Sequence, residues 1–158
     1  MKVALGCDHN GVDIKGQLMS LLNELGYEYQ DFGCYDADSV DYPDVAREVA
    51  QAVGDRRFDT GMLICGTGIG MSITANKVPG VRAALCHDAF SARRAREHID
   101  ANVLCLGGQA IEHDTAKDIV RAYLEAQFDG GRHARRVEKI TALESWTLEE
   151  HSRDRRSS

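Results

Sequence analysis

The sequence predicts an α/β fold, because short apolar runs alternate strictly with amphipathic segments along the chain. Several of these runs are continuously hydrophobic, as strands buried on both faces of a parallel sheet are. Parallel strands are joined by right-handed helical crossovers, which place helices on both faces of the sheet. We therefore expect a three-layer α/β/α, Rossmann-like sandwich with a parallel sheet of about five strands and a C-terminal helix.

Five apolar runs predict the strands. They cover residues 3–5, 27–32, 61–64, 81–85 and 103–106. Apolar side chains at helical spacing predict the helices between them, and Gly26, Gly54 and Pro79 are typical of helix ends. The predicted helices cover residues 12–25, 42–53, 70–77, 89–98, 115–128 and 132 to about 146.

The chain of 158 residues has the length of one domain. We expect this domain to cover residues 1–148. The remaining residues, 149–158, are too hydrophilic to pack, and we expect them to be disordered.

Charge and hydropathy exclude several classes of protein. The net charge is −6 and the basic residues are scattered until a cluster near the C-terminus, which argues against nucleic-acid binding. No stretch approaches the roughly 20 apolar residues of a membrane span, and the first apolar run is too short for a signal peptide. We therefore expect a cytoplasmic protein that binds neither nucleic acid nor membrane.

The five cysteines argue against a disulfide framework or a zinc cluster, because their number is odd and none forms a CxxC pair. We accordingly expect no metal. Most of them lie in or at the end of apolar runs, where a cysteine is typically a small buried hydrophobe.

Polar residues follow the first predicted strand, at the sheet edge where α/β proteins bind ligands. Asp8 and His9 stand there between glycines that allow a sharp turn. An acid beside an imidazole suits a polar site. An ordinary turn with Asp8 as a helix N-cap explains the same residues equally well.

The segment CGTGIG at residues 65–70 follows the third strand and carries the strongest functional signal. Its glycines, Gly66, Gly68 and Gly70, expose successive backbone N–H groups before a helix, an arrangement that binds anions. Cys65 stands at the mouth of this loop, where negative charge on its sulfur is favoured.

A dinucleotide site is the main alternative for this segment. Gly66 and Gly68 match the first two glycines of GxGxxG, but Met71 occupies the third position. The fingerprint thus fails where helix and strand must pack closely. A P-loop fails as well, since no Lys-Ser or Lys-Thr pair follows.

Basic residues near the C-terminus predict a phosphate site. Arg132 and Arg136 share one helix face, next to His133 at the helix N-terminus. A solvated, salt-bridged surface is the alternative. His98, near the end of the fourth predicted helix, is either a site residue or a partner of the helix dipole.

Seven segments in order resemble one known family. They are GCDH at 6–9, DYPD at 41–44, ICGTGIG at 64–70, ANKVPGVRA at 75–83, REH at 96–98, NVLCLGG at 102–108 and GGRHARRVE at 130–138. Together they closely resemble ribose-5-phosphate isomerase type B and its relatives, the galactose-6-phosphate isomerase subunits. The resemblance covers nearly all of residues 1–146.

The resemblance implies an aldose–ketose isomerase of phosphorylated sugars that needs no metal or organic cofactor. It also implies a homodimer or dimer of dimers with sites at the subunit interface. Cys65 matches the base of the cysteine-type branch, whereas another branch uses a Glu at the position of Met71.

The resemblance further implies roles for the other site residues. Thr67 and the amides of residues 66–70 stabilise the enediolate, and His98 with Asp8 opens the sugar ring. Tyr42 lines the sugar site. The phosphate grip consists of His9, Arg132, His133 and Arg136.

Two positions depart from the ribose 5-phosphate pattern, which has Asn where this chain has Ile99 and Arg where it has Gln109. The resemblance implies that both positions reach the substrate bound mainly by the neighbouring subunit. Ribose 5-phosphate is the expected substrate. Allose 6-phosphate, galactose 6-phosphate, a tetrose phosphate, or a non-catalytic nucleotide- or sugar-phosphate-binding module are the alternatives.

Overall fold

The computed structural model describes residues 1–146. The predicted disordered segment, 149–158, and the predicted domain end at residue 148 lie outside the described residues. Within the described part of the chain, no helix is both long enough and apolar enough to cross a membrane. The cytoplasmic location stays a prediction.

A five-stranded, fully parallel sheet forms the middle layer. Its strands are β1 (Lys2–Cys7), β2 (Glu28–Asp31), β3 (Thr60–Cys65), β4 (Ala83–Leu85) and β5 (Val103–Gly107), in the order β2-β1-β3-β5-β4. The predicted α/β class and strand number are confirmed. The fourth strand begins later than predicted, because the backbone N–H of Arg82 donates to the side chain of Asn102 at 2.7 Å.

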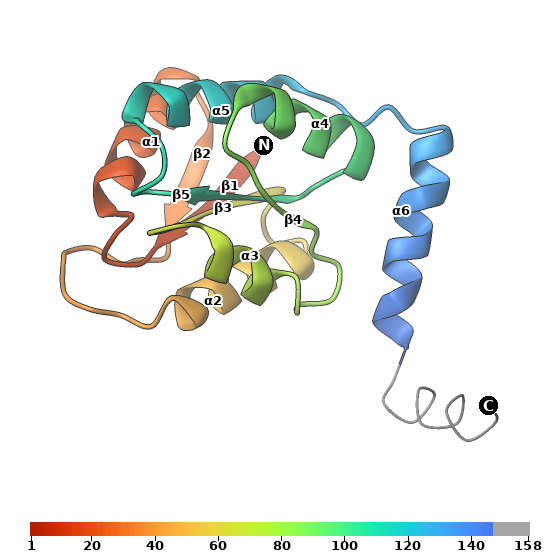
Figure 1. Cartoon of the computed structure of the whole chain (residues 1–158), viewed down its shortest axis with the longest axis horizontal. Helices are drawn as coiled ribbons and strands as arrows, with labels where there is room; N and C mark the ends of the chain where they lie inside the picture. The colour runs from red at the N-terminus through yellow and green to blue at the C-terminus, as the bar shows by residue number, and fades with distance from the viewer. Residues whose placement is uncertain (147–158) are drawn as a thin grey trace.

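Helices cover both faces of the sheet. They are α1 (Val12–Glu24), α2 (Tyr42–Gly54), α3 (Ile69–Ala75), α4 (Ala89–Ile99), α5 (His113–Glu125) and α6 (Arg132–Ala142), followed by a 3-10 turn at Leu143–Ser145. Figure 1 shows α1, α4 and α5 on one face and α2 with α3 on the other, which confirms the three-layer sandwich. The fifth helix ends before residue 128, because the backbone becomes extended at Ala126 (φ −76°, ψ 147°).

The two faces of the sheet have separate hydrophobic cores. Along β3, Met62 and Ile64 belong to the core under α1, α4 and α5, whereas Leu63 and Cys65 belong to the core under α2 and α3. This alternation follows from the period of two in a β-strand. Cys65 therefore ends β3 with its side chain on the α2–α3 side.

The sheet changes winding direction between β1 and β3. The chain leaves β1 through α1 toward β2 on one side, and it leaves β3 through α3 toward β4 on the other. These two helices lie on opposite faces of the sheet. The carboxyl ends of β1 and β3 therefore bound the crevice in which open α/β sheets bind ligands.

The C-terminal helix α6 stands apart from the sandwich, next to the end of α4 (Figure 1). It confirms the predicted C-terminal helix, although the regular helix ends at Ala142. Its side chains Ile140 and Leu143, the latter in the following turn, are exposed. These two apolar side chains therefore do not pack into the hydrophobic cores of the chain.

Gly68 is the tightest point of the loop between β3 and α3. Its backbone is left-handed (φ +76°), and a Cβ there would lie 2.5 Å from Leu85 Cδ1 and 2.8 Å from the backbone carbon of Leu106. Only glycine adopts this conformation without strain. At Gly68 the loop therefore packs closely against Leu85 of β4 and Leu106 of β5.

We predict that Gly68→Ala lowers the free energy of unfolding by more than about 1 kcal/mol, from left-handed strain and steric overlap. Urea denaturation measures the change. Gly16→Ala is the matched control, since Gly16 lies in α1 with nothing within 4 Å of an added Cβ. That variant should gain about 0.5–1 kcal/mol. Equal stability of Gly68→Ala and the parent protein would contradict the prediction.

Candidate active site

Pairing between β1 and β3 brings Asp8 and Cys65 side by side. Cys7 is the register partner of Ile64, and the backbone N–H of Asp8 donates to the carbonyl of Ile64 at 3.0 Å. Asp8 and Cys65 are each 5% exposed. The acid and the thiol thus lie at adjacent strand ends, almost fully shielded from solvent.

The Cys65 sulfur faces the glycine loop. The backbone N–H of Gly68 donates to its Sγ at 3.1 Å. An N–H donor directed at a sulfur favours negative charge on it. Thr67 is exposed beside it, and its hydroxyl accepts the backbone N–H of Ile69 at 3.3 Å.

Three of the other cysteines are poor candidates for a base. Burial raises the pKa of Cys7 to about 11. Burial likewise raises the pKa of Cys86 and of Cys105. These thiols stay protonated near neutral pH, in agreement with the expectation that most cysteines here are buried hydrophobes.

His9 and Tyr42 border the same site. The backbone N–H of Val40 donates to His9 Nδ1 at 3.4 Å. The ring of Tyr42 packs over Gly70, where a Cβ would lie 2.5 Å from Tyr42 Cε2. We define the Cys65 site as Asp8, His9, Tyr42 and residues 65–70.

Sequence reasoning did not select Asn10, and it named Gln109 only as a departure from the ribose 5-phosphate pattern, yet both reach the Cys65 loop. Gln109 Nε2 lies 3.1 Å from Asn10 Oδ1, and a Cβ on Gly66 would meet the side-chain amides of both. Gln109 thus lies beside the Cys65 loop of its own chain, and its reach toward the neighbouring subunit's substrate stays a prediction. Gln109 directly follows Gly107 and Gly108 at the end of a strand, and this position in the sequence could have identified it as a site residue.

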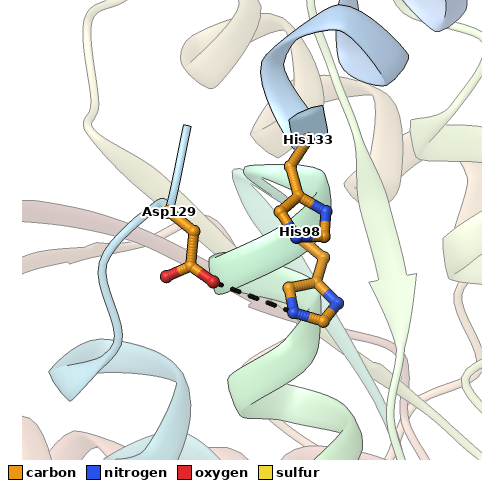
Figure 2. A group of neighbouring side chains, drawn as sticks. All are labelled: His98, Asp129 and His133. Atoms are coloured by element: carbon orange, nitrogen blue, oxygen red, sulfur yellow. Dashed lines mark ion pairs between the residues drawn. The ribbon is translucent and has the colours of Figure 1, made fainter. Parts of the chain in front are cut away.

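A second group of predicted site residues gathers at the end of α4. The rings of His98 and His133 stack with their centroids 4.0 Å apart, and His98 Nε2 lies 3.8 Å from Asp129 Oδ2 (Figure 2). The backbone N–H of Asp129 donates to the carbonyl of Glu97 at 2.9 Å. This bond holds the segment before α6 against α4.

The surroundings of the histidine pair favour an anion. Arg94 Nη1 lies 3.2 Å from His98 Nε2. The pKa of His133 is lowered by burial first, and then by His98, Arg132 and Arg136, whereas Asp129 acts in the opposite direction. These groups disfavour further positive charge and suit a phosphate.

His98, Asp129 and His133 could in principle hold a metal ion, since their ligand atoms lie within 4.8 Å of one another. The imidazole planes, however, are only 9° from parallel. The nitrogen lone pairs of two stacked imidazole rings point in parallel planes, so they do not converge on one ion. An anion therefore fits this group better.

The two groups lie at opposite edges of the sheet within one chain. α4 begins after the carboxyl end of β4 and ends before the amino end of β5, so its last turn, with His98, lies at the amino edge. Cys65 ends β3 at the carboxyl edge. The fold therefore brings Asp8, His9, Tyr42 and the 65–70 loop together, but it leaves His98, Arg132, His133 and Arg136 in a separate group.

Comparison with known proteins agrees with this geometry. A family model described as Ribose/Galactose Isomerase matches residues 3–140. Ribose-5-phosphate isomerase B of Escherichia coli (strain K12) is 48% identical over 143 residues, which cover 90% of this chain and 96% of that protein. D-erythrulose-4-phosphate isomerase of Pectobacterium atrosepticum is 44% identical over 142 residues, which cover 89% of this chain and 93% of that protein.

A solved structure matches equally well. Ribose-5-phosphate isomerase B of Clostridium thermocellum has a TM-score of 0.91 at 50% identity, covering 92% of this chain and 99% of that one. Fold and sequence identity agree over nearly the whole described chain. The chain belongs to the Ribose/Galactose Isomerase family and is a sugar-phosphate isomerase resembling ribose-5-phosphate isomerase B.

Proposed function

We propose that this enzyme interconverts ribose 5-phosphate and ribulose 5-phosphate, with Cys65 as the base. The observation that carries the proposal is the Cys65 sulfur at the mouth of an amide-rich loop beside Asp8. The names of the Escherichia coli and Clostridium thermocellum relatives support the choice of a pentose phosphate.

Aldose–ketose isomerisation moves a proton between two adjacent carbons. The Cys65 thiolate removes the proton from C2 of the open-chain aldose, and the resulting enediolate carries negative charge on its oxygens. The thiol then returns the proton to C1, and the hydroxyl proton of O2 moves to O1, which gives the ketose. Thr67 and the backbone N–H groups of residues 66–70 stabilise the enediolate, a contribution of roughly 10²- to 10³-fold for a single donor in comparable sites.

A second subunit supplies the rest of the site in this proposal. His98 of one chain opens the sugar ring together with Asp8 of the other, and Arg132, His133 and Arg136 bind the phosphate with His9. The opposite positions of the two groups within one chain support this arrangement. A homodimer or a dimer of dimers would provide it.

The surface beside α6 also favours a second copy. A groove of about 650 Å³ runs between α6 and the edge strand β4, and Val81, Ile99, Ile140 and Leu143 are among its lining residues. Ile140 and Leu143 are 43% and 63% exposed within one chain. Burying them against another subunit would remove apolar surface from water.

A tetrose phosphate is the second candidate substrate, because one relative that is 44% identical is a D-erythrulose-4-phosphate isomerase. A coupled isomerase assay across phosphorylated tetroses, pentoses and hexoses decides between them. We expect the highest kcat/KM with ribose 5-phosphate. A higher value with a tetrose phosphate would replace ribose 5-phosphate as the substrate and leave the chemistry unchanged.

We predict that Cys65→Ala lowers kcat by about 10²- to 10⁴-fold, the usual contribution of a positioned base. Binding of the sugar phosphate, measured by calorimetry, should change little. Cys86→Ala is the matched control, since that buried thiol is no part of the proposed site, and it should keep parental kcat. Near-parental turnover by Cys65→Ala would exclude this residue as the base.

Subunit complementation tests the shared site. We co-express Cys65→Ala chains with chains carrying both Arg132→Ala and Arg136→Ala, each inactive alone. Random pairing should restore about a quarter of parental activity, since half of the dimers are mixed and each mixed dimer has one intact site. Co-expression of Cys65→Ala with Asp8→Ala should restore none. A site within one chain predicts no recovery in either mixture.

The lowered pKa of His133 predicts that phosphate binding is linked to proton uptake. A bound phosphate would raise this pKa again, so the complex holds more protons than the free protein near pH 6.5, and affinity rises as the pH falls toward that value. Calorimetry with inorganic phosphate in two buffers of different ionisation enthalpy measures the uptake. His133→Gln retains only the titration of phosphate and of the remaining groups, so it should take up fewer protons. Equal proton uptake by His133→Gln and by the parent protein would contradict the assignment of His133 to the phosphate site.

A further inference from the structure

A stripe of side chains runs along one face of α4 toward the histidine pair. Its members, at helical spacing, are Phe90, Arg94, Glu97 and His98. Arg94 packs over the Phe90 ring, with the guanidinium carbon 5.3 Å from the ring centroid. Its Nη1 lies 2.8 Å from Glu97 Oε2 and 3.2 Å from His98 Nε2. These three neighbours together hold the guanidinium group in place.

Arg94 determines which nitrogen of His98 carries the proton. A guanidinium group has only N–H donors and is always charged in proteins. The 3.2 Å contact is therefore a hydrogen bond only when His98 Nε2 accepts. A neutral imidazole that accepts at one nitrogen carries its proton on the other. His98 is thereby held as the Nδ1–H tautomer.

Asp129 favours the opposite tautomer, but from a greater distance. Its Oδ2 lies 3.8 Å from the same Nε2, beyond the length of a hydrogen bond. A carboxylate at this distance attracts a protonated Nε2 without bonding to it. Arg94 is the closer partner and decides the tautomer.

The orientation of the His98 ring follows from its other contacts. Stacking on His133 fixes the plane of the imidazole. Within this plane, a rotation of about 180° would put a carbon in place of Nε2, and Arg94 would lose its acceptor. Figure 2 shows the second nitrogen of His98 on the side of the ring away from Asp129. Nδ1 is therefore the nitrogen that remains for a ligand.

We propose that Arg94 is a positioning residue for ring opening, which makes His98 present Nδ1–H to the ring oxygen of the sugar. Asp8 of the other chain takes the proton from O1, the bond between C1 and the ring oxygen breaks, and that oxygen receives the proton back from Asp8. The Nδ1–H group stabilises the negative charge that develops on the ring oxygen, whereas a bare Nδ1 would repel it. The proposal rests on the proposed isomerase function.

Arg94→Met tests the contact, because it keeps most of the length of the side chain and removes the donor. We expect kcat/KM for ribose 5-phosphate to fall about 3- to 10-fold, the effect of one hydrogen bond. Arg93→Met is the matched control. Arg93 is 44% exposed, against 47% for Arg94, and it pairs with Glu125 at 3.5 Å. This variant should keep parental kcat/KM, and an equal loss in both variants would overturn the proposal.

Affinity for inorganic phosphate separates positioning from phosphate binding. The guanidinium of Arg94 is already paired with Glu97, which is only 19% exposed. We therefore expect calorimetry to give the same Kd for inorganic phosphate in Arg94→Met and in the parent protein. A clearly weaker affinity in Arg94→Met would make Arg94 a phosphate ligand and overturn its positioning role.

The ¹⁵N spectrum of the His98 imidazole measures the tautomer directly, and the loss of signals in His98→Gln identifies them. At about pH 8.5, where an imidazole is neutral, the parent protein should show a protonated Nδ1 and a bare Nε2. Arg94→Met should shift the proton to Nε2, toward Asp129, and Arg93→Met should keep it on Nδ1. A protonated Nε2 in the parent protein would overturn the proposal.

The two proposals fail in different ways. Unchanged kcat/KM in Arg94→Met, with an active parent enzyme, would overturn only the role of Arg94. A parent enzyme that isomerises no sugar phosphate would instead overturn the proposed function, and the role of Arg94 in ring opening with it.

Discussion

The parallel pairing of β1 with β3 is the interaction on which the site depends. Its register places Cys7, the last residue of β1, opposite Ile64, so that Asp8 lies level with Cys65 at the end of β3. Side chains alternate between the two faces of a strand, and a shift of one residue would turn Cys65 toward the opposite core. The adjacent pairing of β3 with β5 then brings Gln109 to the same loop.

Helical crossovers explain why one chain carries two separate groups of functional side chains. A crossover returns the chain to the amino edge of the sheet, so residues at its start and end lie on opposite edges. α4 places His98 at the amino edge, and α6 carries Arg132 and Arg136 beyond it. The proposed catalysis at Cys65 with proposed phosphate binding at these arginines therefore favours assembly with a second copy, which the exposed apolar side chains of α6 and the following turn also favour.

Position in the strand distinguishes Cys65, the proposed base, from Cys7 and Cys105. Cys7 and Cys105 lie inside the sheet, where desolvation raises the pKa of both thiols. Cys65 ends its strand, where a backbone N–H reaches the sulfur. The same strand that builds the core thus carries the proposed base at the residue where its pairing ends.

The sequence by itself determined the α/β class, the five strands, the glycine loop at 65–70 and the basic cluster near α6, because these depend on residues a few positions apart. Only the tertiary structure decided that β4 begins at Ala83, through a bond to Asn102, and that His98 lies away from Cys65. It also decided that Asn10 and Gln109, 99 positions apart, share one hydrogen bond. Such contacts depend on which strands become neighbours, and strand order is a property of the packed sheet that no local pattern contains.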